Sequence, residues 1–301
     1  MSLSGAVSSA LSGLLSNQEQ MRVISGNVSN AGVEGFTRKT APQSTRVVGN
    51  STNAGVQNAE VQRNVDDFLI ERVRRAETDL AFDETKSEFF QRVQDFFGSP
   101  SSDTNLSNKI NSLRQDIEAL AIEPENSAAQ SSTVQEATNV ARDMRAFSQE
   151  TQNLRAQADL EIDIAVEELN GNLKEIRDLN AQISQVKAAG ESSAELEDRR
   201  DRALKEVSQV IDIETFQRPT GEIAVLSGDS NARPLVDGFA DQLTFGSAGS
   251  LGAGESAGAV RFTDGAEVDA ENIGGRLGAL LQVRDQDLPN FQADLDRLAA
   301  Q

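Results

Sequence analysis

The chain of 301 residues contains no cysteine, histidine, tryptophan or tyrosine. Without cysteine it can form neither a disulfide framework nor a thiolate metal site. Without histidine it lacks the side chain that most often ligates metals and transfers protons near neutral pH. No run of about 18 apolar residues predicts a membrane-spanning helix, and the N-terminus lacks the basic segment of a cleaved signal peptide. The core must therefore be built from phenylalanine and aliphatic residues, a composition typical of long helices.

Positive charge is also scarce. The chain has 28 lysine and arginine residues against 48 aspartate and glutamate residues, for a net charge of −20. This balance argues against nucleic acid and anionic membrane surfaces as partners, since both require a basic surface. Residues 1–60 are nearly neutral, because their basic groups are Arg22, Arg38, Lys39 and Arg46 and their acidic groups are Glu19, Glu34 and Glu60. A neutral end can pack against copies of itself, whereas the acidic remainder stays solvated.

The first 30 residues predict a helix with a heptad repeat. Apolar residues alternate in steps of four and three, and Asn17 takes one position of this assembly seam. A buried asparagine in such a seam would cost stability and fix the register of pairing. An ordinary amphipathic surface helix is the alternative interpretation. The predicted seam residues are Leu3, Val7, Ala10, Leu14, Asn17, Met21, Ile24 and Val28.

A turn follows this helix, with the sequence Asn27-Val28-Ser29-Asn30-Ala31-Gly32-Val33-Glu34-Gly35-Phe36. Asparagine side chains bond their own main chain and tolerate left-handed backbone. We expect Gly32 and Gly35 to supply positive φ where the chain reverses, and Phe36 to fold back onto the helix end. A plain helix C-cap followed by a loop would also fit.

The periodicity predicts a mainly α-helical protein with a small inserted β domain. We expect an N-terminal assembly segment over residues 1–63, formed by the coiled-coil helix and an extended region. A rod of long antiparallel helices should follow over residues 64–210. Within it, Gly98-Ser99-Pro100 and Pro124 should end helices, Thr104 or Asn105 should begin one, and a long helix should cover residues 128–188. Its seam is predicted as Ile162, Val166, Leu169, Leu173, Ile176 and Ile183.

The C-terminal part changes pattern twice. Residues 211–270 contain short alternating segments, which predict the small β domain. Residues 271–301 read as a helix that returns to the rod. Since this helix has no stop signal at Gln301 and no second heptad partners residues 3–28, we expect the sequence to be truncated.

No arrangement of residues indicates catalysis, a cofactor or a metal site. Asp264, Asp269 and Glu271 do not have the spacing of a calcium loop, which leaves a solvated loop as the interpretation. The glycine-rich stretch 246–258 contains no lysine and reads as a flexible hairpin tip. The charged run 195–202 is either an exposed helix with internal ion pairs, or a site where Asp198 with Arg199 or Arg202 ties two helices together.

Two segments resemble a known family. Asn27-Val28-Ser29-Asn30, followed by Gly35-Phe36-Thr37-Arg38, resembles the N-terminal signature of bacterial flagellar rod, hook and hook-associated proteins. The signature residues are Asn27, Ser29, Asn30, Gly35 and Phe36; Gly32, Val33 and Glu34 depart from the usual Asn-Thr-Pro. The combination with a long, flagellin-like helical rod is similar to the hook-associated proteins of the hook–filament junction. A second segment of this chain resembles the transition from rod to β domain in those proteins. Its residues are Leu196, Asp198, Arg199 and Asp201, with Leu204, Val207 and Ser208.

The resemblance implies a structural adaptor that joins hook to filament and assembles with itself into a ring. The implied partners are the hook protein, the next hook-associated protein and an export chaperone that binds C-terminal to this segment. Export through the flagellar type III apparatus is implied, with the protein ending outside the cell. We expect the N-terminal segment to be poorly ordered until subunits assemble. The alternatives are another axial protein such as a flagellin or hook protein, a secreted coiled-coil adhesin or effector, and a murein hydrolase in the β domain.

Overall fold

The computed structural model describes residues 3–45, 55–98, 105–229, 231–249, 251–252 and 254–300, while the side chains of Leu3 and Ser4 lie outside the description. The expectations placed on Ser99, Pro100, Thr104 and Gln301 also fall outside it. The contacts divide the chain into two compact units, residues 1–77 with 169–242 and residues 78–168 with 243–301. Two long helices, α2 (Asp67–Phe97) and α4 (Ser127–Ala188), run through both units.

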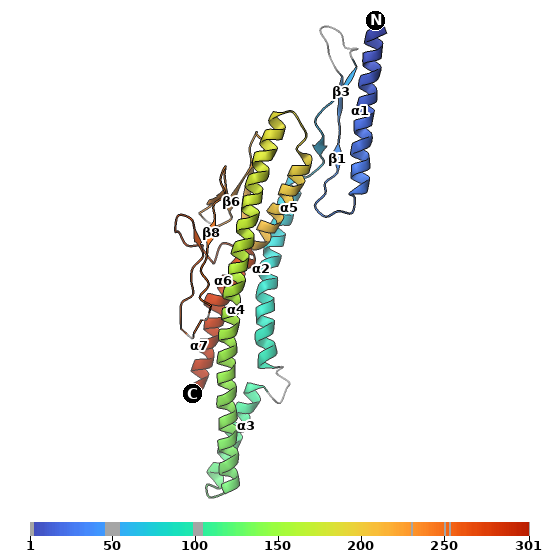
Figure 1. Cartoon of the computed structure of the whole chain (residues 1–301). Helices are drawn as coiled ribbons and strands as arrows, with labels where there is room; N and C mark the ends of the chain where they lie inside the picture. Colours follow the sequence, from blue (N-terminus) through green and yellow to red (C-terminus); the bar gives the residue numbers. More distant parts are fainter. Residues whose placement is uncertain are drawn as a thin grey trace. The chain divides into compact units, whose positions relative to one another are not determined.

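In its described part, the first unit begins with helix α1 (Leu3–Ser29) and four short strands. These strands form two antiparallel pairs, in which β1 (Lys39–Thr40) pairs with β4 (Gln62–Arg63) and β2 (Gln43–Thr45) pairs with β3 (Val56–Asn58). Figure 1 shows β1 and β3 beside the blue α1. We call α1 and residues 37–63 the N-terminal arm.

The rest of the first unit is a helical pair with a small sheet. Helix α4 ends at Ala188, Gly190 takes a positive φ of 74°, and α5 (Ala194–Val210) runs back beside it. A glycine in this conformation is a common helix stop. Aliphatic side chains on the two helices meet in a core that includes Leu173, Ile176 and Leu204, each fully buried. The antiparallel sheet β5–β6–β7 follows, formed by Ile213–Gln217, Ile223–Ser227 and Pro234–Val236.

The second unit is built on the first part of α4. Helix α3 (Leu106–Ile122), capped by the side chain of Asn105, runs antiparallel to α4, with Lys109 paired to Asp143. Strands β8 (Leu243–Thr244) and β9 (Arg261–Phe262) form a separate pair. Helices α6 (Gly275–Gln282) and α7 (Leu288–Ala299) are joined by a π-helical segment, η1 (Val283–Asp287). The core around Phe147 includes a stacked ring contact with Phe97, whose centroid lies 4.1 Å away.

The π-helical segment η1 was not expected from the sequence, which predicted an uninterrupted helix over residues 271–301. The wider turn carries Arg284, whose guanidinium pairs with Asp159 of α4 at 2.7 Å; both side chains are fully buried. Arg155 of α4 donates to the carbonyl oxygen of Arg284 at 3.2 Å. The segment is therefore fastened to α4 by both its side chain and its backbone.

The mainly α-helical class with small β elements is confirmed, and so is the buried seam of α4 from Ile162 to Ile183. The strands predicted within residues 211–270 form two sheets, which belong to different compact units. The division of the chain into four segments stays a prediction.

Candidate functional site: the N-terminal arm and its anchor on α5

Helix α1 turns its hydroxyl-bearing face toward the chain's own strands. The backbone N–H of Val56 donates to Ser12 Oγ at 3.2 Å, and Gln43 Nε2 donates to Ser16 Oγ at 2.6 Å. Ser16 also bonds Asn58 and is 2% exposed. A Cβ on Gly55 would lie 2.2 Å from Ser12 Oγ, so the approach requires a small residue on each side. Ser12 and Ser16 thus serve packing within the chain.

The opposite face of α1 is apolar and exposed. Its large side chains are 54–73% exposed and come from Val7, Leu11, Leu14, Leu15, Met21, Ile24 and Val28. Ala10 and Asn17 of the predicted seam are exposed on the same helix. Burying such side chains stabilises a structure by roughly 1.5–3 kcal/mol each. Sequence reasoning missed Leu11 and Leu15, because they lie outside a strict four-three alternation. We call these seven side chains the apolar face of α1.

The signature turn fixes how the strands leave this helix. The side-chain amide of Asn27 pairs with both backbone groups of Lys39, donating to its carbonyl at 2.8 Å and accepting from its N–H at 2.9 Å. Asn30 Nδ2 donates to the carbonyl of Gly26 at 2.9 Å, which caps the end of α1. Asn27 therefore replaces a strand partner for Lys39, a role that needs a short amide side chain.

Only one of the two glycines expected to take positive φ does so. Gly35 has a φ of 74°, whereas Gly32 is not among the positive-φ glycines, so the expectation for Gly32 was wrong. A Cβ on Gly35 would lie 2.5 Å from Cγ of Arg202 on α5. Gly35 thus serves both the turn and its close approach to α5. Phe36 lies under the ammonium of Lys39, 3.9 Å from the ring centroid.

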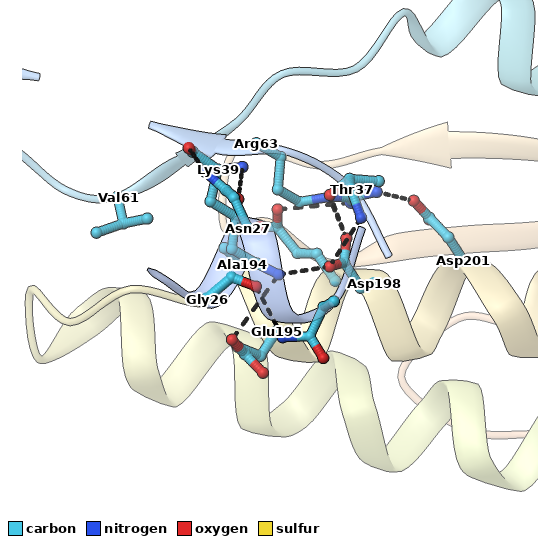
Figure 2. Close-up of polar contacts among 12 residues, drawn as sticks. Gly26, Asn27, Thr37, Lys39, Val61, Arg63, Ala194, Glu195, Asp198 and Asp201 are labelled. Carbon is cyan, nitrogen blue, oxygen red and sulfur yellow. Dashed lines mark hydrogen bonds and ion pairs between the residues drawn. The ribbon is translucent and has the colours of Figure 1, made fainter. Parts of the chain in front are cut away.

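Asp198 on α5 gathers donors from three places in the arm (Figure 2). Its carboxylate accepts hydrogen bonds from Lys39 Nζ at 2.7 Å and from the hydroxyl of Thr37, and it forms an ion pair with Arg63 Nε at 2.9 Å. The Asp198, Lys39 and Arg63 side chains are only 7–8% exposed. Arg63 also pairs with Asp201 one helical turn further along α5. We call Thr37, Lys39, Arg63, Asp198 and Asp201 the anchor cluster.

Neighbouring charges and hydrogen bonds shift the pKa values of Arg63 and Glu197. Burial disfavours the charge on Arg63, but Asp201, Asp198 and Glu197 outweigh it and raise the pKa of the Arg63 guanidinium above its usual value. Burial likewise opposes ionisation of Glu197, but hydrogen bonds from Lys187 and Ser193 hold the pKa of its carboxyl below the usual value. Removing one partner from such a buried group leaves an uncompensated charge, which costs about 3–5 kcal/mol.

The predicted transition residues on α5 separate into two groups. Asp198 and Asp201 belong to the anchor cluster, whereas Arg199 points away from it and pairs with Glu175 of α4 at 3.3 Å. Leu196 is half-buried at the start of the helix. Arg199 thus forms an exposed ion pair with the neighbouring helix, whereas Asp198 ties α5 to the arm rather than to α4. Sequence reasoning did not connect Lys39 and Arg63 to Asp198, because no periodic signal links residues so far apart.

The loop carboxylates considered as a calcium site take part in local turns. Asp269 accepts from Asn272 Nδ2 at 2.8 Å and from the N–H of Glu271, as a loop carboxylate does in a turn. Among the described residues, no group of three or more acidic side chains is placed to hold a metal ion. No described helix has an apolar stretch long enough for a bilayer crossing.

A match to a family profile shows which protein family this chain belongs to. Residues 90–301 match the profile described as the flagellar hook-associated protein FlgK helical domain. The chain belongs to the FlgK family. This confirms the resemblance to flagellar hook-associated proteins on residues that the N-terminal signature does not include.

Several members of the FlgK family align with nearly the whole chain. Flagellar hook-associated protein 1 of Salmonella typhimurium is 28% identical over 314 residues, and that of Escherichia coli is 26% identical over 309. Each alignment covers 99% of this chain and 55% of the relative. The same-named protein of Bacillus subtilis is 23% identical over 72% of this chain and 45% of its own length. The chain thus spans about half the length of the relatives it matches.

A solved structure of the family has the same fold. The flagellar hook junction protein FlgK from Burkholderia pseudomallei superposes with a TM-score of 0.63 and 22% sequence identity. The match covers 76% of this chain and 41% of the other. At this identity the likeness establishes the fold alone.

Proposed function

We propose that this chain is part of a structural adaptor at the junction between flagellar hook and filament, and that it works by assembly rather than catalysis. In this proposal, copies of the protein form a ring that joins the hook protein to the next hook-associated protein. Family membership supports the flagellar role. The observation that carries the assembly role is the apolar face of α1, since a soluble acidic protein rarely exposes a continuous aliphatic surface without a partner for it.

The arm is built to present this face in a fixed direction. Its strands contact the polar side of α1, and Asp198 of α5 binds Lys39 and Arg63 of the arm. Both halves of the family signature are used here, because Asn27 positions Lys39 and Gly35 permits the approach to Arg202. In this proposal the signature is an orienting device for α1, and the predicted assembly seam is the surface that becomes covered.

The neutral charge of α1 favours self-association. Within Leu3–Ser29 the only charged side chains are Glu19 and Arg22, which pair with each other at 2.6 Å. Copies of α1 can therefore lie side by side without the repulsion expected between bodies of an acidic chain. Export by the flagellar type III apparatus, an extracellular position in the flagellum and a C-terminal export chaperone belong to the same proposal through the family.

Electron microscopy of a strain deleted for this gene tests the proposal. We expect hooks without filaments, with flagellin released to the medium, and recovery of filaments when the full-length gene is restored. A deletion strain with normal filaments would contradict a junction role and would favour an adhesin or effector. Binding of purified full-length protein to host-cell or mucin-coated surfaces then tests that alternative.

A further inference from the structure

A buried arginine on α5, close to the anchor cluster, has only neutral hydrogen-bond partners. Arg200 is 1% exposed, and its Nη1 donates to Asn180 Oδ1 at 3.1 Å and to the carbonyl oxygen of Gly221 at 2.7 Å. Its Nε is buried and has no hydrogen-bond partner in the part of the chain that the structure describes. Buried charges in proteins are normally paired, and buried donors normally have acceptors. Arg200 therefore has room for a further acceptor, preferably a negatively charged one.

The two carboxylates that act on Arg200 are bound to other cations. Glu197 accepts from Lys187 Nζ at 2.8 Å and lies 3.7 Å from Arg63 Nη1, and Asp201 pairs with Arg63. Burial lowers the pKa of the Arg200 guanidinium below its usual value, and the opposing effect of Asp201 and Glu197 is smaller. The charge of Arg200 is thus only partly compensated by its surroundings, and an added anion would stabilise it.

A cavity of about 280 Å³ adjoins this arginine, and three cations line it: Arg63, Lys187 and Arg200. Lys187 lies over the turn at Gly221, where a Cβ would come within 2.8 Å of its Nζ, so the lysine and Arg200 meet at the same turn. The volume is below the range of about 300–1,000 Å³ that is typical of cavities for drug-sized ligands. The cavity therefore suits a ligand of only a few atoms.

We propose that this cavity binds a tetrahedral oxyanion such as inorganic phosphate or sulfate, held by Arg200 and flanked by Lys187 and Arg63. Guanidinium and ammonium groups are the usual protein partners of such oxygens. Lys187 is 30% exposed, so its flexible side chain can turn aside to admit the anion. Two further lining carboxylates, Glu60 and Asp67, belong to exposed residues, where solvent screens their charge.

The site lies within a single chain, so the inference does not depend on the proposed assembly role. Its cations come from three elements: Lys187 from the end of α4, Arg200 from α5 and Arg63 from the arm. The bound anion joins these elements and strengthens the attachment of the arm to α5.

Calorimetric titration of the full-length protein with inorganic phosphate tests the site. The buffer contains neither phosphate nor sulfate, and chloride at the same ionic strength is the control, since exposed charges respond to any salt. We expect saturable binding of phosphate and none of chloride. A parallel titration with sulfate shows which of the two anions binds more tightly. If neither phosphate nor sulfate binds saturably to the wild-type protein, the inference is wrong.

Two arginine variants locate the bound anion. Arg200→Gln should weaken binding about tenfold or more, the loss expected for a charge-assisted hydrogen bond. Arg199→Gln is the matched control, because Arg199 is the adjacent residue of α5, is 52% exposed and pairs with Glu175 instead. It should bind phosphate as the wild type does. Wild-type affinity in Arg200→Gln, or an equal loss in both variants, would place the anion elsewhere and overturn the inference.

Hydrogen exchange of the wild-type protein gives a second readout that needs no substitution of a buried residue. Phosphate should raise the protection of residues 55–63 and 194–202, which carry the arm and α5 sides of the site. Residues 106–122 of α3 belong to the other compact unit and should exchange at the same rate with and without phosphate. Protection that rises equally in both units, or in neither, would contradict a site at Arg200.

Discussion

Helix α1 and the α4–α5 pair place their aliphatic side chains in opposite ways. In α4–α5, Leu173, Ile176 and Leu204 point inward and are fully buried. In α1, serines point inward against the strands, and Leu14 and Met21 point outward. The pair holds its own core within the chain, whereas α1 leaves its large aliphatic side chains exposed. Similar aliphatic periodicity therefore stabilises the fold in one region and stays exposed in the other, where the proposed function has it covered on assembly.

The strongest way to break this comparison is to place a charge on the apolar face. Leu14→Asp or Ile24→Asp should abolish junction assembly, because an unpaired carboxylate would be buried in the interface. The purified variants should keep wild-type unfolding transitions, since both positions are exposed in the single chain. Filament counts by electron microscopy together with urea unfolding measure the two effects. Normal assembly of either variant would show that the apolar face is not a contact surface.

Breaking the anchor cluster should have the next largest effect. Asp198→Ala leaves Lys39 and Arg63 buried without their main carboxylate, which should destabilise the arm by about 3–5 kcal/mol. Hydrogen exchange measured by mass spectrometry should show loss of protection in residues 37–45 and 55–63. The control Glu175→Ala removes only the exposed pair with Arg199 and should cost at most about 1 kcal/mol. Unchanged protection in Asp198→Ala would mean that the strands and Asn27 hold the arm without the cluster.

One substitution made on both helices sharpens the comparison. Leu173→Ala should lower the free energy of unfolding by about 2–5 kcal/mol, because it opens a cavity in a packed core. Leu14→Ala should change it by less than about 0.5 kcal/mol in the isolated protein, since the side chain is exposed. Urea denaturation of each variant measures the difference. Equal effects would indicate that α1 buries its apolar face within the single chain.

Lowering the pH should have the smallest and most gradual effect on the free energy of unfolding. The pKa of Glu197 is lower in the folded chain, so its ionised form contributes stability above its ordinary value of 4.5. That contribution should disappear as the pH falls from about 4.5 through the lowered pKa of the folded state. Free energies of unfolding measured between pH 7 and pH 3 should fall less steeply for Glu197→Gln than for the wild type. Identical slopes would show that Glu197 gains no net stabilisation from Lys187 and Ser193.

The local structure was largely predictable from the sequence, and the contacts between distant segments were not. Helical periodicity with Pro124 as a stop predicted α3 and α4 nearly at their observed bounds. The signature predicted a turn, but Gly32 does not use the positive φ expected of it. The anchor cluster was missed because Lys39 and Asp198 lie 159 residues apart, and charged side chains carry no periodic signal for such a pairing. The contacts of Ser12 and Ser16 with the strands were also missed, because no periodic signal links these serines to the strand residues.

Oxidative footprinting of methionine tests the central claim most directly. Met21 lies on the apolar face and is 72% exposed, whereas Met144 packs against the core of the second unit. We expect peroxide to oxidise Met21 rapidly in the isolated full-length protein and about tenfold or more slowly in assembled flagella, because oxidation follows exposure. The rate at Met144 should be similar in both samples and serves as the internal reference. Equal rates at Met21 before and after assembly would contradict the account.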